Sequence, residues 1–222
     1  MTENPRELAV ILHGIGMNRL RMAYLDIALR IAGYDVLNIG YPSLKFSIED
    51  CAKNVSRQIA ARTKSSPAKV HFVAHSMGCL VALDLITNRL IQNIHRAVLI
   101  APPYRGSEVA DLLAQNFLYR RFFGPAGQQL TTSYRKGVDY PLPAEAEIGV
   151  IAGSRAYEYP LFLSTMKKTG VHDGLVSRQS TLVPGAKDHI TIRMSHSFLL
   201  EKSAAQTVHF LRHGTFKKEQ HL

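Results

Sequence analysis

Short apolar runs alternate along the chain with longer segments in which apolar residues recur at helical spacing. Runs that are apolar throughout are typical of strands covered on both faces of a parallel sheet. We predict strands at residues 8–12, 34–39, 69–74, 96–100, 148–152 and 189–192. We predict helices at residues 19–32, 47–63, 77–90, 106–117 and 198–211. Residues 120–144, which contain Gly124-Pro125 and Pro141-Leu142-Pro143, show no pattern that we can assign.

This alternation predicts an α/β fold with a mostly parallel central sheet of about six strands and helices on both faces. The 222 residues suit a single domain spanning 1–222, with a short basic tail from about residue 214. The segment between the fourth and fifth predicted strands is short, so we expect a minimal cap and an open site. In sheets of this kind, ligands bind at the carboxyl ends of the strands.

A candidate nucleophile follows the third predicted strand. The strand leads into Ala74-His75-Ser76-Met77-Gly78, and an apolar helical run follows this turn. A strand, a tight turn with small residues around a serine, and a helix together form a nucleophile elbow. The alternative is an ordinary serine at a helix N-cap. The buried strand before Ser76 and the apolar helix after it favour the elbow.

A serine hydroxyl needs a base to accept its proton and an acid to orient that base. His196 follows the last predicted strand and is our candidate base, whereas His189 lies at the opposite end of that strand. Asp173 follows the fifth strand, in an Asp-Gly turn, and is our candidate acid. Asp188 is the main alternative, but it precedes the sixth strand, at the end of the sheet opposite to His196.

A developing oxyanion requires preorganised hydrogen-bond donors. The backbone N–H of Met77 begins the helix after the candidate nucleophile. The loop His13-Gly14-Ile15-Gly16 follows the first strand, and we expect the Ile15 N–H to be the second donor. The alternative is a plain glycine-rich loop. His13 is expected to hold this loop by hydrogen bonds, and we expect no cofactor and no metal.

The charge, the cysteine content and the N-terminal segment limit which binding partners and which cellular location we expect. The formal net charge of +10 favours nucleic acid, an acidic membrane surface or an anionic substrate, but no aromatic-interleaved nucleic-acid motif accompanies it. We therefore favour a solvated basic surface, and expect no nucleic acid and no obligate protein partner. The two cysteines imply no disulfide framework, and the polar N-terminal segment lacks a signal-peptide pattern, so we expect a cytoplasmic protein.

One segment combines apolar and basic residues. Phe117, Phe122 and Phe123 lie beside Arg120 and Arg121 in the sequence. We favour a packed helix end for this group, and the alternative is weak contact with an anionic membrane surface.

The order Ser76, Asp173, His196 resembles that of the α/β-hydrolase superfamily. More narrowly, the chain resembles small bacterial lipases and esterases of the triacylglycerol-lipase type. Four segments carry this resemblance: residues 13–16, 74–78, 102–107 and 172–176. The resemblance implies a serine hydrolase that cleaves carboxylic esters, a small-molecule substrate, through an acyl-enzyme. A thioesterase or acyltransferase with the same three residues, or a non-catalytic binding module on this scaffold, remains an alternative.

Overall fold

The computed structural model describes residues 7–63, 67–156 and 166–218. Six parallel strands form one sheet in the order β2-β1-β3-β4-β5-β6. Their bounds are β1 Leu8–Leu12, β2 Asp35–Ile39, β3 Val70–His75, β4 Ile94–Ile100, β5 Glu147–Gly153 and β6 Asp188–Ile192. All six predicted strands are therefore confirmed, with small shifts at their ends.

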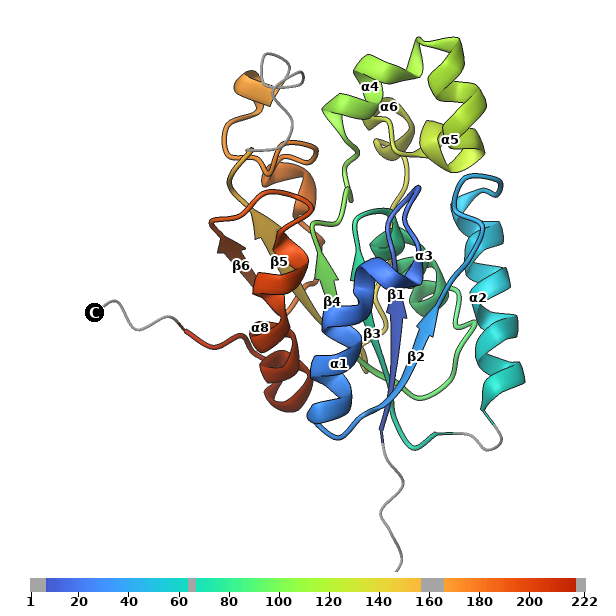
Figure 1. The fold of residues 1–222 in the computed structure, drawn as a ribbon, viewed down its shortest axis with the longest axis vertical. Helices are drawn as coiled ribbons and strands as arrows, with labels where there is room; N and C mark the ends of the chain where they lie inside the picture. Colours follow the sequence, from blue (N-terminus) through green and yellow to red (C-terminus); the bar gives the residue numbers. More distant parts are fainter. Residues whose placement is uncertain (1–6, 64–66, 157–165, 219–222) are drawn as a thin grey trace, which may run out of the picture.

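Helices cover both faces of this sheet (Figure 1). One face carries α1 (Ala23–Ile31) and α8 (Leu199–His213), and the other carries α2 (Ile48–Arg62) and α3 (Met77–Thr87). Successive side chains of a strand point to opposite faces, so Leu8, Val10 and Leu12 enter one core cluster and Ala9 and Ile11 the other. The predicted α/β-hydrolase architecture is confirmed.

The first predicted helix is divided in two in the structure, and the second is confirmed. The segment predicted as one helix at residues 19–32 begins with a short 3₁₀ helix, η1 (Arg19–Met22), before α1. The Asn18 side chain caps η1 by accepting a hydrogen bond from the Leu20 N–H. The helix at residues 47–63 is confirmed as α2, and the Ser47 hydroxyl accepts from the Asp50 N–H as its N-cap.

The segment between β4 and β5 contains more helix than the sequence pattern indicated. It forms α4 (Glu108–Ala114), α5 (Phe117–Gln129) and α6 (Thr132–Arg135), where we expected one helix and a loop. Asn116 ends the continuous helix that the pattern suggested, because its side chain accepts from the Leu118 and Tyr119 N–H groups and starts α5. These three helices lie beyond the carboxyl ends of the strands (Figure 1).

Two further short 3₁₀ helices, η3 (Lys167–Thr169) and η4 (Gln179–Thr181), lie between β5 and β6. Among the described residues, none of the helices has the length and apolar character that a membrane span requires.

Candidate active site

Ser76 lies at the turn between β3 and α3. Its backbone angles are φ 52° and ψ −127°, a conformation that costs a non-glycine residue about 1–3 kcal/mol. The Ser76 N–H donates to the carbonyl oxygen of Ile100 at 2.8 Å, which ties the turn to the end of β4. Strain of this kind persists only where the surrounding structure imposes it. The strand, turn and helix that we expected around Ser76 are present.

A small residue two positions after Ser76 is required by the approach of β1. A Cβ atom at Gly78 would lie 2.5 Å from the His13 carbonyl oxygen and 2.7 Å from the Leu12 carbonyl oxygen. Both neighbours are backbone atoms, which cannot move aside cheaply. The glycine therefore lets α3 begin directly against the loop that follows β1.

Asp173 and His196 meet in a buried ion pair. The Nδ1 atom of His196 lies 2.7 Å from the Oδ2 atom of Asp173, and both side chains are almost fully buried. The other carboxylate oxygen of Asp173 accepts from the backbone N–H groups of Leu175 at 3.0 Å and Val176 at 2.8 Å. The His196 N–H also donates to the Asp173 carbonyl oxygen at 3.0 Å. The two loops are thus joined through backbone and side chain together.

These contacts keep the Asp173 carboxylate charged. Burial raises its pKa, but the charge and hydrogen bond of His196, followed by the Val176 and Leu175 N–H groups, lower it further than burial raises it. The net pKa lies below the ordinary value for aspartate. A carboxylate in this state fixes the proton of His196 on Nδ1 and leaves Nε2 as an acceptor.

His75 connects the serine turn to the His196 loop. It is the last residue of β3 and the direct neighbour of Ser76, and its Nε2 lies 3.1 Å from the His196 carbonyl oxygen. The rings of His75 and His196 lie 4.7 Å apart between centroids. The structure thus brings all three predicted residues, Ser76, Asp173 and His196, to the carboxyl end of the sheet. Sequence reasoning assigned His75 no role.

The two backbone N–H groups expected to stabilise the oxyanion belong to α3 and to the loop after β1. Met77 is the first residue of α3, and the first N–H groups of a helix have no acceptor within it. No described residue accepts a hydrogen bond from the Ile15 N–H. A Cβ atom at Gly14 would lie 3.1 Å from the Ser76 Cβ atom, so the Ile15 loop adjoins the serine.

Contacts of Tyr41 and His13 hold the loop of residues 13–16 in place. Their rings stack with centroids 4.3 Å apart and planes 9° from parallel. The Tyr41 hydroxyl donates to the His13 carbonyl oxygen, and the Gly16 N–H donates to the Ser43 hydroxyl at 3.2 Å. The Nδ1 atom of His13 lies 2.8 Å from the Gly14 carbonyl oxygen, as expected for a histidine that holds the loop. Burial lowers the pKa of His13, so it stays neutral near pH 7.

The alternatives Asp188 and His189 lie elsewhere. Asp188 begins β6 and accepts hydrogen bonds from the N–H groups of His189 and Phe216, each at 2.8 Å. The Nε2 atom of His189 lies 3.0 Å from the Thr181 hydroxyl. Both side chains are thus occupied at the start of the strand, and His196 follows its end. Within the described parts of the chain, no group of three or more His, Cys, Asp or Glu side chains could hold a metal ion.

Gly153, the last residue of β5, is a second position that sequence reasoning missed. A Cβ atom there would lie 2.6 Å from the Asp173 Cβ atom and 2.7 Å from the Met194 carbonyl oxygen. The Asp173 turn and the loop before His196 therefore pack directly on the end of β5. A glycine at the end of a predicted strand was the available signal.

Comparison with known proteins agrees with this arrangement. The sequence model of the alpha/beta hydrolase family matches residues 9–214. The chain belongs to the alpha/beta hydrolase family. No curated protein sequence matches the chain.

Solved structures of a lipase and a thioesterase share the fold at low sequence identity. The mature form of the Bacillus licheniformis lipase BlEst2 is 19% identical, with a TM-score of 0.79, over 96% of this chain and 92% of the lipase. Its propeptide form is 18% identical, with a TM-score of 0.81, and the match spans 99% of this chain but only 53% of that protein. YbtT, the type II thioesterase of the yersiniabactin pathway, is 15% identical over 96% of this chain and 94% of its own, with a TM-score of 0.59. Identities this low show the fold alone. The lipase and the thioesterase are both hydrolases by their names.

Proposed function

We propose that this protein is a serine hydrolase that cleaves carboxylic esters through an acyl-enzyme on Ser76. The observation that carries the proposal is the buried Asp173–His196 pair, 2.7 Å apart, beside a serine in a strained turn. A structural serine at a helix N-cap needs no buried histidine–carboxylate pair next to it. It also needs no conformation that costs free energy.

In the proposed first step, the Ser76 Oγ atom attacks the ester carbonyl carbon while its proton passes to Nε2 of His196. The carbonyl electron pair moves onto oxygen, where the Met77 and Ile15 N–H groups stabilise the negative charge. Asp173 stabilises the imidazolium and keeps its Nδ1 proton in place. When the carbon–oxygen bond of the ester breaks, the leaving alcohol takes the proton from His196.

The second step returns the enzyme to its starting state. Water attacks the acyl carbon and gives its proton to His196, and the bond between that carbon and the Ser76 Oγ atom breaks. Ser76 recovers its proton from His196, and the carboxylic acid leaves. Neither step requires a metal or a cofactor, because each transfers only protons and an acyl group.

Labelling with a fluorophosphonate tests this proposal directly, because only an activated serine reacts with the probe. We expect the wild-type protein to be labelled at Ser76 and to hydrolyse p-nitrophenyl esters. Ser76→Ala should lose both properties while keeping its circular dichroism spectrum. An unlabelled wild-type protein would favour a non-catalytic binding module, and labelling of Ser76→Ala at another serine with retained turnover would refute the assignment.

A thioesterase is the second candidate, because YbtT has the same fold and acts on thioesters by its name. The acyl-enzyme is common to both activities, and only the leaving group differs. A panel of p-nitrophenyl esters and acyl-CoA thioesters with matched acyl chains separates the two. We expect higher kcat/KM values for the oxygen esters, and a consistent preference for the thioesters would reassign the protein.

A further inference from the structure

Large apolar side chains on α5 are exposed to solvent. The exposed fractions of Phe117, Leu118 and Phe122 are 74%, 71% and 63%. Arg120 and Arg121 lie between them in the sequence and are also exposed. We call these five residues the α5 patch. The packed helix end that the sequence favoured for Phe117 and Phe122 is therefore not what the structure has.

At about 100° per residue, the five residues of the α5 patch cover about 200° of the helix circumference. The opposite side carries Tyr119 and Phe123, whose rings stack with centroids 4.7 Å apart. A Cβ atom at Gly16 would lie 3.8 Å from the Phe123 ring, so this side of α5 rests against the Ile15 loop. The helix thus has its own anchoring aromatic residues, and those of the patch are additional to them.

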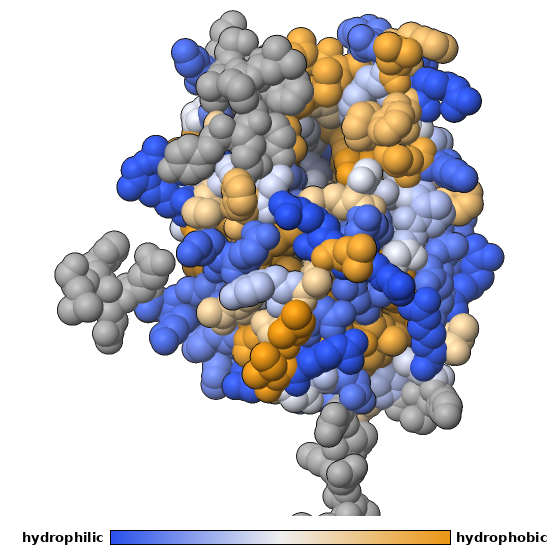
Figure 2. Space-filling view, in the orientation of Figure 1, coloured by the Kyte–Doolittle hydropathy of each residue, from blue (hydrophilic) through white to orange (hydrophobic). Residues whose placement is uncertain are grey.

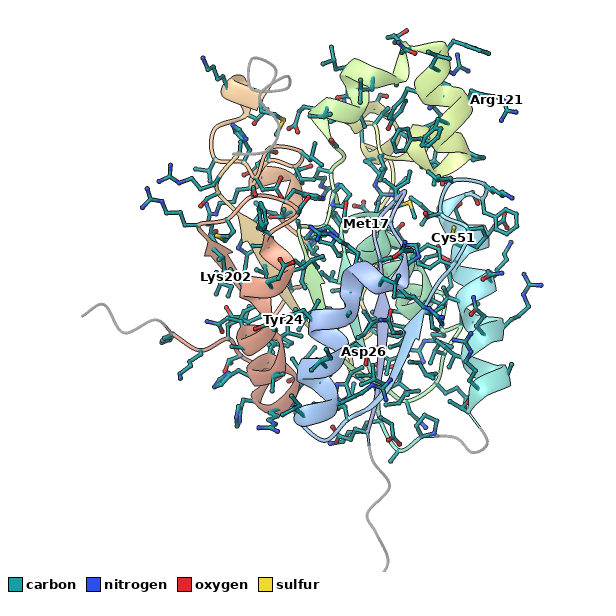
Figure 3. All side chains as sticks on the ribbon, viewed as in Figure 1. Met17, Tyr24, Asp26, Cys51, Arg121 and Lys202 are labelled. Atoms are coloured by element: carbon teal, nitrogen blue, oxygen red, sulfur yellow. The ribbon has the colours of Figure 1, made fainter. Side chains whose placement is uncertain are left out.

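Apolar and cationic groups are combined in the patch. Neither Arg120 nor Arg121 has an acidic partner within the described part of the chain. Figure 3 shows the Arg121 side chain pointing away from the body of the protein. Exposed phenylalanine and leucine beside unpaired arginine are the composition of surfaces that insert at the boundary of an anionic bilayer.

The patch is on the same side of the molecule as Ser76. Figure 2 shows apolar side chains gathered around α4 and α5, at the top of the view, above the carboxyl ends of the strands in Figure 1. An open hollow of about 710 Å³ runs beside the patch, lined by Leu113, Leu118 and Phe122 among others. A bilayer bound here would lie next to the candidate active site.

We propose that the α5 patch docks this protein onto the surface of anionic lipid membranes. A symmetric contact with a second copy of the chain would bring the arginines of the two patches together, and like charges oppose such a contact. Anionic phospholipid headgroups supply the opposite charge, and the overall charge of +10 adds long-range attraction. The inference does not depend on ester hydrolysis.

Cosedimentation with vesicles tests this proposal, using Ser76→Ala so that turnover cannot change the lipid. We expect binding to vesicles of equal parts phosphatidylcholine and phosphatidylglycerol, weakened by salt, and little binding to phosphatidylcholine alone. Arg120→Gln with Arg121→Gln should weaken binding about 25-fold, since each arginine near anionic lipid contributes about fivefold. Phe117→Ser with Phe122→Ser should weaken it at least about tenfold.

Matched controls separate the patch from general charge and hydrophobicity. Arg57→Gln with Arg62→Gln removes two exposed arginines of α2, and Ile27→Ser with Ile31→Ser removes two exposed apolar residues of α1. Both control proteins should bind vesicles like the parent protein. When residue 76 is kept as serine, all four double variants should hydrolyse a soluble short-chain ester at the wild-type rate.

Three outcomes would overturn the proposal. The first is no binding to anionic vesicles, and the second is binding that the patch variants leave unchanged. The third is a dimer in size-exclusion chromatography that becomes monomeric only in the patch variants, without vesicle binding. That result would assign the patch to a second copy. Failure of ester hydrolysis with normal vesicle binding would refute only the proposed function.

Discussion

The Nε2–H of His75 donates a hydrogen bond to the carbonyl oxygen of His196, with 3.1 Å between nitrogen and oxygen. The acceptor is a carbonyl, so the proton of His75 must be on Nε2, and its Nδ1 is buried without a partner among the described residues. This bond joins the end of β3 to the loop after β6. The residue next to the candidate nucleophile therefore positions the candidate base.

Removing the His75 donor should slow acylation without weakening substrate binding. His75→Phe keeps a buried ring but cannot donate to His196, and one hydrogen bond contributes about 0.5–1.5 kcal/mol. We expect kcat to fall up to about tenfold with KM nearly unchanged. Steady-state kinetics on a soluble p-nitrophenyl ester measures both values.

The conservative variant His75→Gln provides the control, because its amide can donate from a similar position. It should recover most of the kcat lost in His75→Phe. If the two variants have equal kcat values, or if the loss appears only in KM, His75 does not act by positioning His196. The rate of fluorophosphonate labelling should follow kcat, since labelling requires the same base.

His75 should also make the fold sensitive to acid. Burial, followed by the charge of His196, lowers the pKa of His75 from the usual 6.5 to about 3. Between these values the unfolded chain binds a proton that the folded protein excludes. The free energy of unfolding should therefore fall as the pH falls from about 6.5 towards 3, by about 1.4 kcal/mol per pH unit from this group.

Urea unfolding at a series of pH values checks this expectation. His75→Phe should have a shallower pH dependence than the wild-type protein in this window, and the two slopes should agree above about pH 7. His71, whose burial lowers its pKa to about 4, provides part of the slope that remains. Equal slopes for wild type and variant below pH 6 would show that His75 is not kept neutral by the fold.

Asp173 and Asp188 can be separated by matched amide substitutions. Asp173→Asn should reduce kcat about 10⁴-fold, the loss seen when the acid of a serine-protease triad becomes an amide, because His196 then adopts the wrong tautomer. Asp188→Asn should stay near wild-type activity, since within the described residues Asp188 accepts from the backbone N–H groups of His189 and Phe216, at the start of β6 and after α8. The reverse pattern in ester hydrolysis would make Asp188 the acid.

The strands were predictable because apolar residues are concentrated in each, although β2 and β6 also contain several polar residues, and the order of the chemistry-bearing residues followed from where these segments end. Ser76, Asp173 and His196 were found in this way, since each follows a predicted strand. Their shared position needs only a parallel sheet, which the alternation of strands and helices predicts. The contact between Asp173 and His196, 2.7 Å between Oδ2 and Nδ1, joins residues 23 positions apart, and no local pattern contains it.

The helices between β4 and β5 were less predictable. Asn116 starts a second helix directly after the first, and Gly124, whose φ of 58° and ψ of −157° are not helical, divides α5 into two helical segments at a kink before Pro125. Asparagine, glycine and proline at such positions indicate the boundary of a helix. They do not indicate whether a helix or a loop lies on each side of it. His75 and Tyr41 act through contacts between residues far apart in the sequence, and such contacts exist only in the folded chain.

Gly153→Ala should lower activity through Asp173 while leaving the sheet intact. The new methyl group would lie 2.6 Å from the Asp173 Cβ atom and 2.7 Å from the Met194 carbonyl oxygen, so the Asp173 turn must move. A displacement of about 1 Å at a catalytic group can cost on the order of 100-fold in rate. Gly40→Ala is the matched control, because Gly40 lies at the same end of the sheet, directly after β2, and its Cβ would have no neighbour within 4 Å. We expect kcat to fall sharply only in Gly153→Ala, which should also unfold at a lower temperature than the control because the Met194 carbonyl oxygen is a backbone atom, and circular dichroism at the assay temperature checks that the variant is folded. Full activity of Gly153→Ala would mean that the position of Asp173 against β5 does not matter for the reaction, and the Asp173–His196 pair would then lose its role as the fixed part of the site.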